Sequence, residues 1–410
     1  MSSLYSVNYH LRSHKRDAFI DFIKSMLLPA FILSTASPST KLAKYIEVMV
    51  AIQDLIDDHI KHQKPSNKSQ RLSRLSQLVP STGSFFTRLD LQSAFLIQDD
   101  RRSMSGRQFV PPSFNDIRYI LNSAQIAAIA PNLKLLTFDG DMTLYADGKD
   151  FDKDSKIVAQ IMAILSKGIN VAIVTAAGYS DACGYEKRLN GLLYRFKEAL
   201  GNVEALNVGT FSNFYVLGGE CNFMFRYNPA TFRLEAIDKV AFQTAEMRGW
   251  DANEIEIGLF LDAAESQLKL TAELMQLDYS SPNSLVRIIR KDRAVGLISN
   301  SKDFALTREQ LDEFALATKH ALNLKHAMMI PFCCFNGGSD VWVDIGNKFI
   351  GVLLLCEYLR CKGSETLHVG DQFLGTGNDI ATREGCCTVW ISEPEETASL
   401  LEDLIPILRV

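Results

Sequence analysis

The stretch LKLLTFDGDMTLY, from Leu133 to Tyr145, runs a short apolar segment directly into two aspartates, Asp139 and Asp141. An apolar run of this length predicts a buried central strand of an α/β sheet, with Asp139 at its carboxyl end. Side chains two residues apart in an extended chain point the same way, so both carboxylates would face one crevice. A hard divalent cation would offset their repulsion, whereas the ordinary alternative is a solvated Asp-Gly-Asp turn.

Length and composition describe a soluble globular protein of two or three domains. The chain has 410 residues, of which 47% are hydrophobic and 22% are charged. A net charge of -5 without blocks of like charge argues against nucleic acid as a partner. The apolar segment near the N-terminus is interrupted by Asp17, Asp21, Lys24 and Pro29, which argues against a signal peptide or membrane span. Eight scattered cysteines without a C-x-x-C motif predict reduced thiols and a cytoplasmic protein.

The pattern of elements predicts one α/β domain that is split by an insertion. After the opening strand, DSKIVAQIMAILSKG reads as a helix and NVAIVTAAGY as a second strand, which together form a βαβ unit with parallel strands. The expected divisions are a helical N-terminal region (1–105), the first part of the core (106–183), an inserted α+β domain (184–327) and the second part of the core (328–410). In the N-terminal region, His59 and His62 stand three residues apart on a predicted helix, where a solvated helix face is favoured over a metal site.

In a sheet of this kind, ligands bind at the carboxyl ends of the strands. The residues expected there are Asp139, Asp141, Thr175, Asp371 and Lys348, the last at the start of a helix. Each alone has an ordinary explanation as a turn former, a strand residue or a solvated lysine. Their joint occurrence at successive strand ends favours a phosphate monoester as substrate. The glycines of GDQFLGTGND do not fit a dinucleotide-binding motif, and Asp379 within it is expected to begin the next helix rather than to support a metal.

Each residue type has a physical role in phosphate ester hydrolysis. The carboxylate of Asp139 would attack phosphorus, and Asp141 would protonate the leaving oxygen and then deprotonate water. Thr175 would bind a phosphoryl oxygen, and Lys348 would stabilise negative charge in the transition state. Mg²⁺, held by Asp139, Asp371 and the backbone carbonyl of Asp141, would reduce the repulsion between carboxylate and phosphate.

These motifs resemble those of a known superfamily, and longer stretches resemble one family within it. FDGDMT, IVTA, Lys348 and VGDQF resemble the four motifs of the haloacid dehalogenase (HAD) superfamily, which implies a Rossmann-like core with a parallel sheet and a mobile cap of the C2 type. RQFVPPSFNDIRYILNSAQ, LLTFDGDMTLYADG, VAIVTAAGY, FNGGSDVWVDIGNK and LHVGDQFLGTGND resemble the IMP-specific 5'-nucleotidase family. The similarity covers most of the chain.

The family resemblance implies Mg²⁺-dependent hydrolysis of inosine 5'-monophosphate (IMP) to inosine and phosphate. It implies Asp139 as nucleophile, Asp141 as proton donor, and Asp139, Asp141 and Asp371 as metal ligands. It also places a set of five residues at the substrate, namely Asp141, Asp147, Thr175, Asp340 and Lys348.

The resemblance further implies a homotetramer that is activated by ATP through the N-terminal region. Tyr119 departs from this pattern, because it stands where relatives carry a basic residue or histidine. Two alternatives stay open. One is the same chemistry on other substrates, by a broad-specificity phosphatase or a nucleoside phosphotransferase, and the other is a catalytically silent nucleotide sensor.

Overall fold

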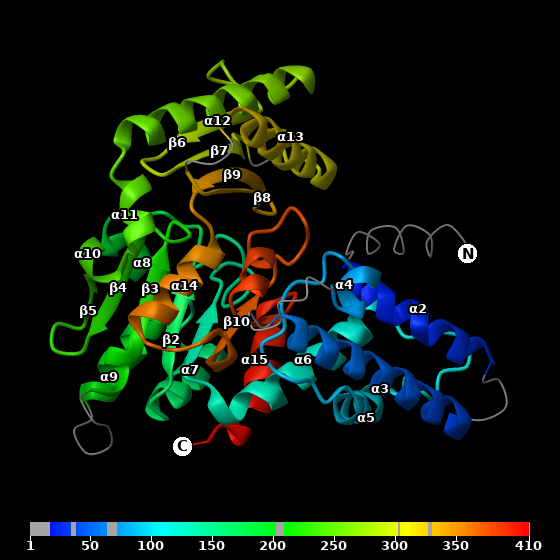
Figure 1. The fold of residues 1–410 in the computed structure, drawn as a ribbon. Coiled ribbons are helices and arrows are strands. Elements are labelled where there is room, and N and C mark those ends of the chain that lie inside the picture. The colour runs from blue at the N-terminus through cyan, green and yellow to red at the C-terminus, as the bar shows by residue number, and fades with distance from the viewer. Residues whose placement is uncertain are drawn as a thin grey trace.

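The computed structural model describes residues 17–33, 38–63, 72–201, 209–301, 304–326 and 330–409. Figure 1 shows three parts: a group of helices from the N-terminal region, an α/β core beside it, and a cap of helices and strands above the core. The fold class expected from the sequence, an α/β core with a largely parallel sheet and an inserted α+β cap, is therefore confirmed.

A seven-stranded sheet forms the core. Its strands, in spatial order, are β11 (Cys387–Trp390), β10 (Thr366–Gly370), β1 (Leu135–Phe138), β2 (Asn170–Val174), β3 (Phe214–Gly218), β4 (Phe223–Asn228) and β5 (Arg233–Ala236). The first five are parallel, and β4 and β5 form an antiparallel edge. The carboxyl ends of β10, β1 and β2 therefore meet at one edge of the sheet.

Helices cover both faces of this sheet, which explains why β1 is apolar throughout rather than alternating. Leu136 and Phe138 pack in one hydrophobic cluster, whereas Leu135 packs in another on the opposite face. The helices of the core are α7 (Lys156–Ser166), α8 (Ala182–Arg188), α9 (Asn190–Gly201), α14 (Lys348–Tyr358) and α15 (Pro394–Leu404). Residues of α7, α9 and α15 belong to the first cluster and residues of α14 to the second.

The cap contains an antiparallel sheet backed by two long helices (Figure 1). Its strands, in spatial order, are β6 (Val286–Arg290), β7 (Ala294–Ser299), β9 (Asp340–Ile345) and β8 (Phe332–Asn336). The helices are α12 (Glu254–Leu274) and α13 (Arg308–His326). Val341, Val343 and Ile345 are buried in the cluster that contains α12 and α13, so the alternate residues of β9 point away from these helices.

The sheet pairing corrects both expected boundaries of the insertion. The sequence predicts an insertion at 184–327 that would contain β3, β4 and β5, but β3 pairs in parallel with β2 and belongs to the core sheet. Conversely, β8 and β9 fall in the predicted second part of the core, but they complete the cap sheet. The periodicity of a strand reports its own burial and not its partner, so these assignments required the tertiary structure. Two short helices, α10 (Lys239–Phe242) and α11 (Ala245–Asp251), lead into the cap, and Gly346 and Asn347 lead out.

The N-terminal region packs against the core through its own hydrophobic cluster, which includes Phe373 and Trp390 of the core. Its helices are α2 (Ala18–Leu33), α3 (Pro38–His62), α4 (Arg74–Leu78) and α5 (Leu91–Arg102). Helix α6 (Phe114–Ile129), which the sequence assigns to the first part of the core, contributes to the same cluster and is grouped with them. His59 is buried, and its ring nitrogens contact Ser73 Oγ and the carbonyl of Gly83, so the expectation of a solvated histidine at this position was wrong. Among the described helices, none combines the length and the apolar character needed to cross a membrane.

Candidate active site

A buried ion pair between Asp139 and Lys348 forms the centre of the candidate site. Asp139 follows β1, and its backbone N–H donates to the carbonyl of Val369 in β10. Lys348 is the first residue of α14, and its side chain is fully buried. Its Nζ lies 2.7 Å from Oδ1 of Asp139. Burial raises the pKa of Asp139 to about 7, although the charge of Lys348 opposes this shift. The two residues predicted from separate motifs are therefore in direct contact.

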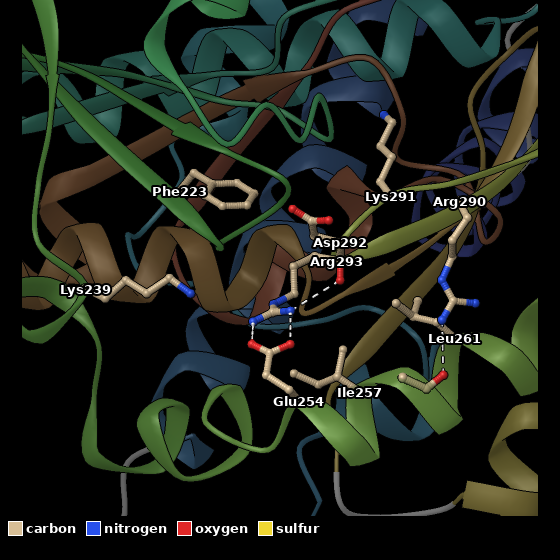
Figure 2. A pocket seen from close by; sticks show the side chains of 10 residues that line it. Phe223, Lys239, Glu254, Ile257, Leu261, Arg290, Lys291, Asp292 and Arg293 are labelled. Carbon is tan, nitrogen blue, oxygen red and sulfur yellow. Dashed lines mark hydrogen bonds and ion pairs between the residues drawn. The ribbon is translucent and has the colours of Figure 1, made fainter.

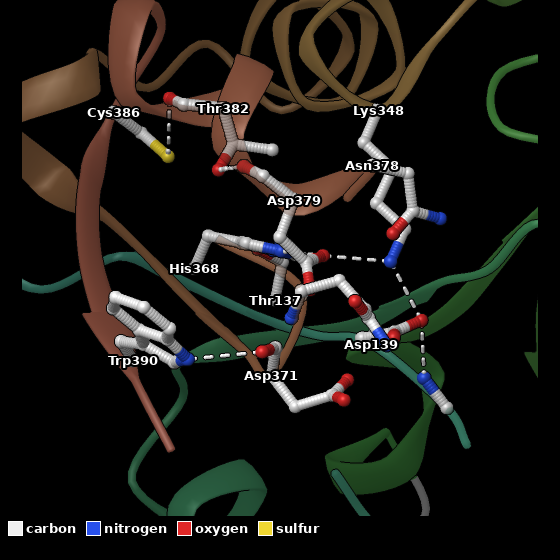
Figure 3. Close-up of polar contacts among 12 residues, drawn as sticks. Thr137, Asp139, Lys348, His368, Asp371, Asn378, Asp379, Thr382, Cys386 and Trp390 are labelled. Atoms are coloured by element: carbon white, nitrogen blue, oxygen red, sulfur yellow. Dashed lines mark hydrogen bonds and ion pairs between the residues drawn. The ribbon is translucent and has the colours of Figure 1, made fainter. Parts of the chain in front are cut away.

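Asp379 holds the other side of Lys348. Its Oδ1 lies 2.7 Å from Lys348 Nζ and 2.9 Å from His368 Nε2, and its Oδ2 accepts a hydrogen bond from the Gln372 N–H. Figure 3 shows Asp379 between His368 and Lys348. Burial would lower the pKa of Lys348, but the carboxylates of Asp139, Asp379 and Glu220 raise it. Asp379 does begin a short 3₁₀ helix, Asp379–Glu384, as expected, and it also fixes the ammonium group of Lys348.

Asp371 follows β10 and joins Asp139 at the same edge of the sheet. Carboxylate oxygens of Asp139, Asp371 and Asp379 all lie within 4.8 Å of one another. Burial, together with the charges of Asp139 and Asp379, raises the pKa of Asp371 well above its usual value. Since both oxygens of Asp379 already accept hydrogen bonds, Asp139 and Asp371 offer the free oxygens of this group. A hard cation such as Mg²⁺ fits these oxygen donors.

The side chain of Asp141 points to a different partner. Its Oδ1 accepts hydrogen bonds from the backbone N–H of Gly148 and from the guanidinium of Arg188, each at 3.1 Å. Burial raises the pKa of Asp141, while Arg188 acts in the opposite direction. Asp141 lies two residues after Asp139 as expected, but the group of carboxylates that the structure brings together contains Asp379 in its place.

Thr175 lies beside the Asp139 turn, where it was expected. It follows β2, and a methyl group placed on Gly140 would lie 3.6 Å from its Oγ1. That Oγ1 accepts a hydrogen bond from the Ala177 N–H, so the hydroxyl proton is free to be donated to another acceptor. The structure thus places Thr175 near the carboxylate that would attack phosphorus.

Asp147 and Asp340 come together across the boundary between core and cap. Asp147 is exposed, and its Oδ2 lies 3.5 Å from the hydroxyl of Ser339, which immediately precedes Asp340 in the cap. Burial raises the pKa of Asp340, and the charges of Asp147 and Asp141 act in the same direction. Asp340 begins β9, and Trp342 lies two residues further on the same face, with Lys291 Nζ 4.0 Å from its ring centre.

Four residues close to this site are absent from the set that the sequence predicts: Arg188, Glu220, His368 and Asn378. Arg188 pairs with Asp141, and Asn378 Nδ2 donates to Glu220 Oε1 at 2.9 Å. The sequence could have indicated His368, because this residue lies in the strand that ends just before Asp371. No sequence pattern indicated Glu220, since the strand before it falls within the predicted insertion.

A separate cavity of about 560 Å³ lies between the cap and the core edge, and its lining residues do not include Asp139, Asp371 or Asp379 (Figure 2). Cationic side chains line it: Arg293 pairs with Glu254 and Asp251, Lys239 also pairs with Asp251, and Lys291 lies over the Trp342 ring. Its charges therefore stabilise the entrance to the cap rather than forming a free anion site.

The largely parallel core, the inserted cap and a lysine held between two aspartates define a phosphoric monoester hydrolase. The family model for IMP-specific 5'-nucleotidase matches residues 1–401. The chain belongs to the IMP-specific 5'-nucleotidase family.

Relatives match over their full length. The chain is 40% identical to IMP-specific 5'-nucleotidase 1 of Neurospora crassa, covering 100% of this chain and 99% of the relative. It is 38% identical to that of Saccharomyces cerevisiae, covering 99% of both. Among solved structures, an IMP-bound mutant of Plasmodium falciparum IMP-nucleotidase has 33% identity and a TM-score of 0.82, covering 96% of this chain and 97% of that one. The ATP-bound Plasmodium falciparum enzyme has 33% identity and a TM-score of 0.78, covering 95% and 85%.

Proposed function

We propose that this protein hydrolyses IMP to inosine and phosphate in a Mg²⁺-dependent reaction that passes through an aspartyl-phosphate on Asp139. The contact of Asp139 with the buried ammonium of Lys348, next to the carboxylate of Asp371, carries the proposal. The names of the relatives, and the IMP bound to one of the solved structures, support IMP as the substrate.

The positions of Asp139, Lys348 and Thr175 support the following chemistry. A carboxylate oxygen of Asp139 forms a bond to phosphorus while the bond to the 5'-oxygen of the nucleoside breaks, and Asp141 donates a proton to that oxygen. Asp141 then takes a proton from water, whose oxygen attacks the aspartyl-phosphate and releases inorganic phosphate. Lys348 and Thr175 stabilise the negative oxygens of the phosphoryl group in both steps. Asp139, Asp371 and the backbone carbonyl of Asp141 would hold Mg²⁺, which would supply positive charge that reduces the repulsion between carboxylate and phosphate.

The cap supplies the remaining contacts of the substrate. We infer that Asp147 of the core and Asp340 of the cap accept hydrogen bonds from the ribose hydroxyls, since their carboxylates lie on opposite sides of the same boundary. Closure of the cap over the nucleoside would exclude water during the first step.

A substrate panel tests this function. Purified protein with Mg²⁺ is assayed for phosphate release from IMP, AMP, GMP and a sugar phosphate, with inosine added in parallel as an acceptor. We expect IMP to be preferred by at least tenfold in kcat/KM. Comparable turnover of all four would indicate a broad-specificity phosphatase, and transfer of phosphate to added nucleoside would indicate a phosphotransferase. Absence of phosphate release from every substrate would favour a silent nucleotide sensor.

We further propose regulation by ATP, assembly into a tetramer and a cytoplasmic location. The ATP-bound relative supports ATP as an effector, for which we propose a site in the N-terminal region. The eight free cysteines are typical of a reducing compartment. Light scattering with and without ATP tests assembly, and the rate of IMP hydrolysis as a function of ATP concentration tests activation. An unchanged rate at saturating ATP would exclude the effector.

A further inference from the structure

A second group of potential ligands, separate from the three aspartates, lies where the cap meets the core. One ligand atom from each of Glu220, Cys333 and Asp344 lies within 4.8 Å of the other two. Glu220 belongs to the core, whereas Cys333 and Asp344 belong to β8 and β9 of the cap sheet. The group therefore spans two parts of the molecule that only folding brings together.

The pairing of strands in the cap sheet points the side chains of Cys333 and Asp344 toward the core. Cys333 lies directly opposite Asp344 in the antiparallel pairing of β8 with β9, so the two side chains share a face. Asp344 lies two residues after Trp342 and four residues after Asp340. Its side chain is therefore on the face of β9 opposite the one buried against α12 and α13.

Glu220 approaches from the turn between β3 and β4. Its φ is +66°, a left-handed conformation that residues other than glycine seldom adopt. Its backbone N–H donates to the carbonyl of Thr175, which ties this turn to the carboxyl end of β2. The turn thus holds the Glu220 side chain beneath the cap at a cost in backbone conformation, which is common at functional positions.

Three of the four carboxylate oxygens of Glu220 and Asp344 lack a hydrogen-bond partner. Asp344 is only 2% exposed, and neither of its carboxylate oxygens has a hydrogen-bond partner. Glu220 is fully buried; its Oε1 accepts from Asn378, and its Oε2 has no partner. Within the described residues, neither carboxylate forms an ion pair, and the nearby Lys348 is already shared between Asp139 and Asp379. Buried carboxylates in native structures are normally paired or coordinate a metal, so this arrangement calls for a bound cation.

We propose that Glu220, Cys333 and Asp344 bind a divalent transition-metal ion of the Zn²⁺ class, which links the cap to the core. The donor set distinguishes this site from the one at Asp139. Mg²⁺ and Ca²⁺ select oxygen ligands, whereas a thiolate together with carboxylates suits the softer Zn²⁺. Burial raises the pKa of the Cys333 thiol, so the thiol carries its proton in the metal-free protein and releases it to solvent when the metal binds.

The metal has a route to the site. A cavity of about 250 Å³ lies between the core loop that follows Thr175 and the cap, and Asp344 lines it. Because one ligand comes from the core and two come from the cap, bound metal would hold the cap in its closed position and slow its opening. This role concerns the position of the cap and does not depend on which phosphate ester is the substrate.

Direct metal binding tests the proposal on the full chain. The protein is treated with a chelator, dialysed into excess Mg²⁺ so that the aspartate site is saturated, titrated with Zn²⁺, and analysed for retained zinc by mass spectrometry. We expect one equivalent of zinc in the parent protein and at least a tenfold weaker affinity in Cys333→Ser and in Asp344→Asn. Cys183→Ser, which removes an exposed thiol elsewhere, is the matched control and should bind zinc as the parent does.

Replacement of Zn²⁺ by Co²⁺ gives a spectroscopic readout that can be observed in the parent protein itself. Coordination by Cys333 should give the parent protein a thiolate-to-cobalt charge-transfer absorption, which Cys183→Ser retains and Cys333→Ser loses. No retained zinc in the presence of Mg²⁺, or no charge-transfer band in the parent, would overturn the proposal. Loss of the zinc in Asp371→Asn but not in Asp344→Asn would also overturn it, because the metal would then belong to the aspartate site.

Discussion

Lys348 Nζ lies at the same distance, 2.7 Å, from Oδ1 of Asp139 and from Oδ1 of Asp379. One ammonium group therefore contacts two buried carboxylates. Asp139 stands at the end of β1 with an oxygen available for chemistry, whereas Asp379 has both its carboxylate oxygens in hydrogen bonds, with Lys348, His368 and Gln372 as partners. In the proposed mechanism, Asp139 is the reacting aspartate and Asp379 is the one that positions Lys348.

Asp139→Asn should abolish phosphate release from IMP while the fold is retained. The amide is close in size to the carboxylate but is a poor nucleophile, so we expect a loss of at least about a thousandfold in kcat. The measurement is phosphate release with Mg²⁺, together with a thermal unfolding curve. Asp154→Asn, at an exposed turn residue, is the control and should retain full activity. Residual turnover near that of the parent would place the nucleophile elsewhere.

Asp379→Asn should act mainly through Lys348 and His368. Lys348 keeps Asp139 as its ion-pair partner, but it and His368 both lose a charged acceptor, and leaving buried donors poorly satisfied costs roughly 1–3 kcal/mol in the free energy of unfolding. Urea denaturation measures this loss, and kcat should fall because Lys348 is no longer held on both sides. Glu402→Gln breaks the exposed pair with Lys156 and should change stability by less than about 1 kcal/mol. Equal effects of the two substitutions would refute the positioning role of Asp379.

The ion pair between Glu396 and Arg118 should make the free energy of unfolding depend on pH in the acid range. Burial alone would raise its pKa, but the hydrogen bonds and charge of the buried Arg118 lower it from 4.5 to about 2. A depressed pKa means that the pair stabilises the folded state above pH 4.5, and that this contribution, about 3 kcal/mol, is lost as the pH falls toward 2. Urea unfolding as a function of pH measures it.

Glu396→Gln should lower stability at pH 7 and remove this part of the pH dependence. Because Arg118 lies on α6 and Glu396 on α15, the same substitution should loosen the N-terminal region from the core. Glu395→Gln, on the exposed side of α15, is the matched control. If the free energy of unfolding changed with pH in the same way in Glu396→Gln and in the parent, another group would be responsible for the loss of stability in acid.

Gly346→Ala should destabilise the connection from the cap to α14. Gly346 has a φ of +82°, and a methyl group added there would lie 2.2 Å from Cys221 Sγ. The left-handed conformation alone costs at least about 1 kcal/mol for alanine, and the overlap adds to it. Gly249→Ala, in helix α11 with open space around it, should be neutral or stabilising by up to about 1 kcal/mol. Thermal unfolding compares the two, and a stable Gly346→Ala would mean that this connection adapts readily.

Much of the candidate site was predictable because it follows from local sequence patterns. An apolar run predicts a buried strand, the residue after the run lies at the carboxyl edge, and parallel strands bring such edges together. These local rules suffice to place Asp139, Thr175 and Asp371 near one another and Lys348 at the start of a helix. The family resemblance adds Asp147 and Asp340, which the structure places on either side of the boundary between core and cap.

The remaining features depend on contacts between residues far apart in the chain. Neither the pairing of β3 with β2 nor that of β8 with β9 can be read from periodicity, because a strand pattern does not identify its neighbour. For the same reason, only the tertiary structure brings Arg188 to Asp141 and Glu220 to Cys333 and Asp344. The sequence by itself therefore determined the type of core and the chemistry at its strand ends, whereas long-range pairing decided which side chains surround that chemistry and where the cap meets it.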